Sequence, residues 1–174
     1  MHINGAQADF GQAVYAGDFV QTGPASYVDI VFDRVNIFRL GANTVAILDI
    51  GAARQEVELK FGTMAAVFDR LSVATGFSVR TPTTTAGVRG TAFFLRVIDN
   101  STVYQCTCNG SVHLHADGNE EFVETAAEHS AYYFTESDNV VSVRSAGELY
   151  HTNDGLNELA AVISVTIPWG SISE

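Results

Sequence analysis

Residues 77–108, FSVRTPTTTAGVRGTAFFLRVIDNSTVYQCTC, contain the strongest pattern of short strands and turns in the chain. It opens with an alternating segment, Phe77 to Arg80, and passes through a turn rich in threonine, proline and glycine. A second apolar segment follows at 92–98, and a third contains both cysteines of the chain. Alternation of apolar and polar residues is typical of strands, and glycine and proline mark turns. We therefore predict three consecutive β-strands in this stretch.

Arg89 stands close to two glycines, Gly87 and Gly90, inside this stretch. Glycine permits a positive φ and a close approach of neighbouring backbones. A guanidinium is a planar fork of donors, and a buried charge must be paired. We predict a structural role for these three residues, in which backbone carbonyls accept hydrogen bonds from the Arg89 side chain.

The composition describes an acidic, folded chain. The 174 residues carry a formal net charge of −11, and Lys60 is the only lysine. Hydrophobic residues make up 47%, which is enough for one domain with a core. An acidic surface without basic clusters argues against binding to nucleic acid or to anionic membranes. No apolar run is long enough to span a bilayer, and the first residues do not form a signal peptide.

Short alternating segments continue through the rest of the chain. In the clearest, residues 56–61, every second residue from Val57 to Phe61 should face a core and the charged residues, Glu56 among them, should face water. Gly62 should end that strand. Further strands are expected at 27–32, 36–40, 44–48, 63–68, 102–110, 111–116, 130–134 and 140–144.

One segment has helical periodicity. Thr152 or Asn153 should cap a helix that runs to about Val162. Leu156 and Leu159 would lie on one face of this helix, as expected when a helix packs on the body of a domain.

The sequence thus predicts an all-β fold with one short C-terminal helix. Many short strands separated by glycine turns are typical of a two-sheet sandwich or of a coil-like, solenoid-type stack, and the spacing does not separate the two. We expect an all-β domain over residues 1–149. A C-terminal helix and an extended tail, residues 150–174, should pack on it, with the indole of Trp169 docked on the body.

Several motifs, in this order, resemble the FecR domain family. They are GDFVQTG at 17–23, LKFGT at 59–63 and VRGT at 88–91, and the segments 102–110 and 126–133 fit the family's later strands. The resemblance covers about residues 14–134. It implies an all-β extracytoplasmic module of a bacterial envelope, and hence a periplasmic or extracellular location after removal of a signal peptide.

The family's best-known members sense iron–siderophore uptake and relay the signal across the inner membrane to a sigma factor. This sequence has no recognisable anti-sigma segment, transmembrane helix or secretin-like subdomain. It is therefore more similar to the stand-alone, soluble FecR-type proteins, in which a Cys-x-Cys strand and later histidines also occur.

Four residues form the one chemically suggestive set: Cys106, Cys108, His129 and His151. The cysteines are two apart on a predicted strand, so they share a face with Cα atoms about 6.5–7 Å apart. That spacing disfavours a mutual disulfide but suits two vertices of a tetrahedral metal site. His129 precedes a strand and His151 precedes the helix, so both can fold back onto the cysteine face. Such a Cys2His2 set favours zinc and is also compatible with copper or iron.

Two other interpretations of the thiols remain open. They are a disulfide in a bent strand, in an oxidising compartment, and two buried free thiols that behave as small hydrophobes. A second candidate pair, His113 and His115, should lie on the solvent face of one strand.

No nucleophile elbow, phosphate-binding loop or distinct pair of catalytic acids occurs in the sequence, so we do not expect an enzyme. The sequence predicts a non-catalytic β-module that binds a protein or glycan partner or assembles with copies of itself. Assembly would use an edge strand or a terminal segment such as Met1–Phe10 or Trp169–Glu174. The alternative is a metal-binding or redox-sensing protein built on the Cys2His2 set.

Overall fold

The computed structural model describes residues 1–51, 55–69, 71, 76–116 and 121–172, and only the backbone of residues 89–91. Within these residues the chain forms thirteen strands followed by one helix. The elements are β1 (His2–Ile3), β2 (Ala6–Gln7), β3 (Asp18–Gln21), β4 (Val28–Phe32), β5 (Asn36–Leu40), β6 (Val45–Ile50), β7 (Gln55–Phe68), β8 (Phe77–Arg80), β9 (Thr84–Val97), β10 (Thr102–Ala116), β11 (Phe122–Ala126), β12 (Ser130–Ser137), β13 (Val140–Ala146) and α1 (Asn153–Val162).

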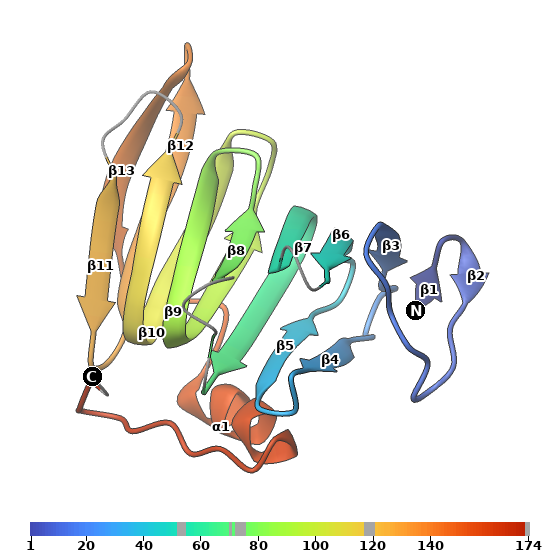
Figure 1. Ribbon diagram of the computed structural model, residues 1–174. Helices are drawn as coiled ribbons and strands as arrows, with labels where there is room; N and C mark the ends of the chain where they lie inside the picture. Colours follow the sequence, from blue (N-terminus) through green and yellow to red (C-terminus); the bar gives the residue numbers. More distant parts are fainter. Residues whose placement is uncertain (52–54, 70, 72–75, 117–120, 173–174) are drawn as a thin grey trace.

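All strands belong to one sheet (Figure 1), in the order β13-β12-β10-β9-β8-β7-β6-β3-β1-β2, with β11 beside β10 and the β4–β5 hairpin beside β7. β7 pairs with both β8 and β9, and β8 also pairs with β9, so the sheet returns on itself. It closes into a five-stranded barrel with extra strands. The all-β prediction with one C-terminal helix is confirmed, whereas the two-sheet sandwich or coil-like stack is wrong.

The long strands explain why two separate sheets do not form. The first half of β7 pairs with β6 and β8, and its second half pairs with β5 and β9. Gly62 lies where the neighbours change and has a φ of +93°, a conformation that glycine adopts without strain. The sequence predicted that Gly62 ends a strand. Instead, Gly62 bends β7 without ending it, so one continuous strand pairs with different neighbours before and after this glycine.

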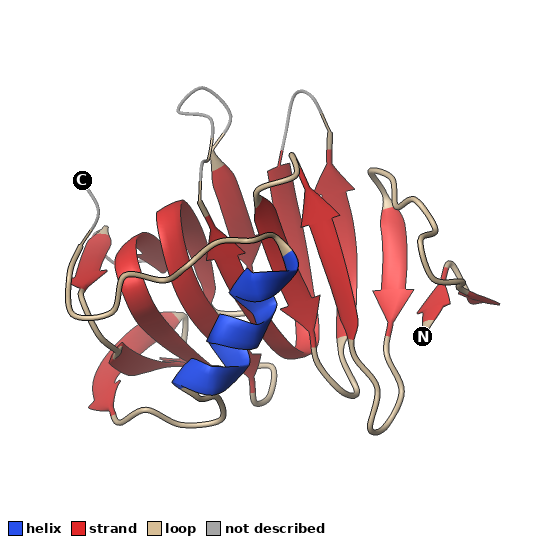
Figure 2. Ribbon diagram, turned by 90° about the horizontal axis from the view of Figure 1, so that it is seen from below, coloured by secondary structure: helices blue, strands red, loops and turns tan. Residues whose placement is uncertain are grey.

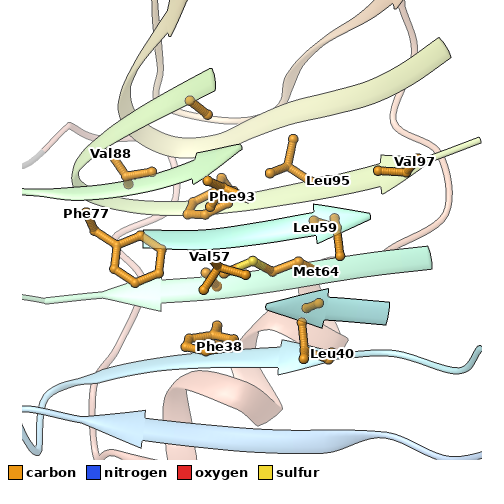
Figure 3. Packing of buried hydrophobic residues seen from close by; sticks show 14 of the residues in the cluster. Phe38, Leu40, Val57, Leu59, Met64, Phe77, Val88, Phe93, Leu95 and Val97 are labelled. Carbon is orange, nitrogen blue, oxygen red and sulfur yellow. The ribbon is translucent and has the colours of Figure 1, made fainter. Parts of the chain in front are cut away.

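The barrel interior is filled by apolar side chains of the central strands (Figure 3). Val57 and Leu59 are fully buried, as predicted. Phe61 is 49% exposed because the register between β7 and β6 shifts between Leu59 and Phe61 and breaks the alternation. Glu56 is only 8% exposed and lies beside Arg80 of β8. The predictions that Phe61 faces the core and Glu56 faces water are therefore wrong.

The predicted helix is confirmed, with its cap and its buried face. The Thr152 hydroxyl accepts a hydrogen bond from the backbone N–H of Gly155 at 3.2 Å, which caps α1. Leu156, Leu159 and Ala160 are buried against β5 and β7, and α1 lies across one face of the sheet (Figure 2). α1 has ten residues, and in the described part of the chain no helix is long and apolar enough to cross a membrane.

The structural role predicted for Gly87, Gly90 and Arg89 stays a prediction. Gly87 lies between Ser78 of β8 and His113 of β10, and a Cβ added there would be 3.6 Å from the His113 carbonyl oxygen, an ordinary contact. The surroundings of Gly90 and the side chain of Arg89 lie outside what the structure describes.

Candidate metal centre

Strand β10 places both cysteines on the face of the barrel that α1 covers. Cys106 and Cys108 are fully buried and belong to a second apolar cluster, distinct from the barrel interior. This cluster also contains Phe94 and Tyr104 and the buried residues of α1. Both cysteines are free thiols. The shared face that the i, i+2 spacing predicted is therefore present.

Antiparallel pairing brings the first histidine to the cysteines. β12 starts at Ser130, which pairs with Thr107 of β10, so His129 arrives beside the Cys-x-Cys segment. The backbone N–H of His129 donates to the carbonyl oxygen of Cys108 at 3.2 Å. His151 reaches the same place from the loop that leads into α1, directly before the cap residue Thr152.

The four predicted ligands come together. The Nδ1 atom of His129 lies 3.5 Å from Cys106 Sγ, and the Nε2 atom of His151 lies 3.2 Å from Cys108 Sγ. These two nitrogens are 3.3 Å apart, and all four donor atoms lie within 4.8 Å of one another. Zn–S bonds of about 2.3 Å and Zn–N bonds of about 2.0–2.1 Å give a tetrahedron with edges of about 3.3–3.8 Å. The cluster can therefore hold a metal ion with little rearrangement.

In its neutral form, each histidine can direct a lone pair toward the thiols, because the proton of the ring is used by the outer nitrogen. The outer Nε2–H of His129 donates to the side-chain oxygen of Asn153, and Glu148 lies 3.7 Å from the same nitrogen. The outer Nδ1–H of His151 donates to the carbonyl oxygen of Leu149 at 2.8 Å. Such bonds fix the tautomer and orientation of metal-binding histidines. Such outer-shell partners are typical of metal sites, and the sequence did not predict Asn153 or Leu149 in this role.

Aromatic rings hold the two imidazoles in place. Phe94 stacks on His151, with ring centroids 4.6 Å apart and planes 11° apart. Trp169 stacks on His129, at 5.4 Å and 22°, and its indole N–H donates to the Asn157 side chain at 3.0 Å. The predicted docking of Trp169 on the body is thus confirmed. These rings also limit the access of water to the thiols.

The environment favours one thiolate in the cysteine pair. A hydrogen bond from Cys108, together with weaker ones from His151 and His129, lowers the pKa of Cys106 to about 5 against the opposing effect of burial. Burial raises the pKa of Cys108. Burial also opposes the protonation of His129, but its hydrogen bonds to Asn153 and Cys106 outweigh that effect and raise its pKa. The thiolate is the form of cysteine that binds metals, so the lowered pKa of Cys106 favours the form that can act as a ligand.

The second candidate pair lacks such surroundings. His113 and His115 lie on the exposed side of β10, as predicted, and His113 contacts Glu121 at 3.0 Å. Among the described residues, neither belongs to a group of three or more potential metal ligands. We therefore do not assign a site to them.

The fold of this chain is similar to that of a protein of known structure. Two crystal structures of a protein described as a "putative anti-sigma factor" from Parabacteroides distasonis ATCC 8503, at 1.65 Å and 2.50 Å resolution, match with a TM-score of 0.59 and 12% identity. The match covers 73% of this chain and 59% of that protein, so this chain spans less than two thirds of its length. At this identity the likeness is one of fold alone.

Among curated proteins, no sequence matches the chain. The FecR protein family, in contrast, matches residues 18–113, which is more than half of the 174 residues and lies inside the span of the predicted resemblance. The matched region includes Cys106 and Cys108, whereas His129 and His151 lie beyond it. The chain therefore belongs to the FecR protein family.

Proposed function

We propose that this chain is a non-catalytic, metal-binding FecR-type module that holds one Zn²⁺ ion through Cys106, Cys108, His129 and His151. The observation that carries the proposal is the convergence of the four donor atoms, each within 4.8 Å of the others. Two thiolates and two imidazoles are a donor set that zinc prefers, and the engaged outer nitrogens of both histidines support it.

A closed site supports a structural rather than a catalytic role for the ion. Catalytic zinc sites keep one position open for water or substrate, whereas structural sites use four protein ligands. Here four side chains are available, and both cysteines are fully buried. The ion would tie β10, the start of β12 and the loop before α1 together.

Replacing His151 tests this proposal against a matched control. We expect the wild-type protein, purified without chelator, to contain about one zinc per chain. His151→Asn should lower the zinc affinity by more than about 100-fold, because loss of a ligand costs more than loss of an outer-shell partner. His113→Asn replaces an exposed histidine of β10 and should leave zinc content unchanged. Equal zinc affinity of the two variants in competition with a chromophoric chelator, or a metal-free wild type, would refute the assignment.

A second candidate role is the binding of a protein partner or another copy through the edge of β4. β4 pairs only with β5 in the described sheet, and Val31 on it is 48% exposed. A groove of about 790 Å³ runs beside this strand and is lined by Ile30, Met1 and the exposed Phe10 among others. An extended segment can add a strand at such an edge.

Light scattering coupled to size exclusion tests the self-assembling form of this second role. We expect a concentration-dependent increase in mass that Val31→Lys suppresses, because a charge on an edge strand opposes pairing. A strict monomer at the highest concentrations would count against self-assembly.

The extracytoplasmic location remains a prediction, which fractionation of the source cells would test.

A further inference from the structure

The C-terminal segment, residues 147–172, forms a strap across one face of the barrel (Figure 2). Its buried side chains, Leu156, Leu159, Ala160 and Ile167, pack on an apolar cluster that includes Phe94 of β9. This cluster is separate from the barrel interior. The barrel can therefore keep its own core while the strap is docked or detached.

The strap is held to the barrel mainly by side chains of β10. The Tyr104 hydroxyl donates to the carbonyl oxygen of Gly147 at 3.0 Å and accepts from the backbone N–H of Leu149 at 2.9 Å. The side-chain amide of Asn109 donates to the carbonyl oxygens of Pro168 and Ser171, at 3.2 and 2.8 Å. Between these two anchors lie Cys106 and Cys108, the β10 ligands of the proposed metal site.

The strap itself contributes to the proposed site. It carries His151, and its Asn153 accepts from His129. Its Trp169 stacks on His129 as well. The metal ion would thus crosslink the barrel to the arm of the strap before α1 through His151, whereas the arm after α1 meets the site only through the stacking of Trp169 on His129.

Without that crosslink the strap is held by the buried face of α1 and by isolated hydrogen bonds, such as those of Tyr104 and Asn109, rather than by a strand ladder. No strand in the described part of the chain pairs with it. α1 has only ten residues and includes Gly155, and helices shorter than about 12–15 residues are marginal by themselves. Ordering the rest of the strap costs conformational entropy that the few buried side chains must offset.

We propose that metal binding locks the C-terminal strap onto the barrel, and that metal release frees the strap and uncovers the apolar face beneath α1. This inference rests on the proposed function, since the four residues must first bind a metal. The barrel stays folded in both states because its interior cluster does not involve the strap.

Hydrogen exchange on the full chain, loaded with one equivalent of Zn²⁺ or stripped with EDTA, tests this proposal. Metal removal should accelerate exchange of the α1 amides by at least about tenfold, and in the stripped protein the central β9 amides should stay at least about 100-fold more protected than those of α1. Trp169, the only tryptophan, reports the same event by a red shift of its fluorescence. The double variant Cys106→Ser, Cys108→Ser should behave like the stripped protein even with Zn²⁺ added.

The outcomes separate the two proposals. Zinc binding with unchanged exchange in α1 overturns the strap inference and leaves the metal site in place. Absence of zinc binding overturns both. Equal protection of α1 and β9 in the stripped protein also overturns the inference, because it would mean that the metal holds the whole barrel rather than the strap. His113→Asn serves as the control with normal binding and a docked strap.

Discussion

We expect chelation of the proposed metal ion to lower the midpoint of thermal unfolding, followed by circular dichroism, by roughly 10 °C. A ligand that binds only the folded state, at 100 to 1,000 times its dissociation constant, stabilises it by about 2.7–4.1 kcal/mol. For a chain of this size, 1 kcal/mol moves the midpoint by about 2–4 °C. The effect should be large because the four ligands come from three separate segments of the sequence, so the unfolded chain does not present a complete site.

The control for this prediction is the double variant Cys106→Ser, Cys108→Ser. It should melt near the temperature of the stripped wild-type protein and should not respond to chelator. Identical midpoints for the loaded and stripped wild-type protein would contradict a stabilising metal. A shift of the same size in the double variant would show that the chelator acts elsewhere.

Gly62→Ala destabilises the protein by about 2–5 kcal/mol, from backbone strain and overpacking together. The φ of Gly62 is +93°, which residues with a Cβ rarely adopt. A Cβ there would also lie 2.6 Å from the Cα of Thr44, a backbone atom that cannot move aside without shifting β6. Equilibrium unfolding in urea measures the change.

Gly51→Ala is the matched control for this substitution. Gly51 has no positive φ, and a Cβ there meets nothing within 4 Å, so its replacement should change stability little. Similar unfolding midpoints for the two alanine variants would mean that the bend at Gly62 does not set the path of β7 through the barrel.

The cluster of four potential metal ligands could be predicted from the sequence, because local rules fix half of its geometry. Two residues at i and i+2 on a strand share a face whatever the strand pairs with, so Cys106 and Cys108 had to lie side by side. The other half of the geometry, the placement of the two histidines, required only that the chain return twice to strand β10. His129 before β12 and His151 before α1 satisfy this, and the start of the helix was predicted from a cap at Thr152 or Asn153.

The barrel could not be predicted, because it depends on which strands each half of β7 and β9 meets. That choice is made by contacts between distant residues, and Gly62 is equally compatible with a strand end and a strand bend. The exposed Phe61 shows the same limit, since the register shift that turns it outward belongs to the pairing with β6. The outer-shell oxygens of Leu149 and Asn153 were missed for the same reason.

X-ray absorption at the zinc edge of the purified, metal-loaded protein is the sharpest test of zinc binding by Cys106, Cys108, His129 and His151, because it reports the ligands of the ion itself. The Cys2His2 assignment predicts about two sulfur ligands at about 2.3 Å and about two nitrogen ligands at about 2.0–2.1 Å, with imidazole scattering. His151→Asn should lose part of the imidazole signal. A first shell made only of oxygen and nitrogen would contradict the account, since it would place the ion away from Cys106 and Cys108.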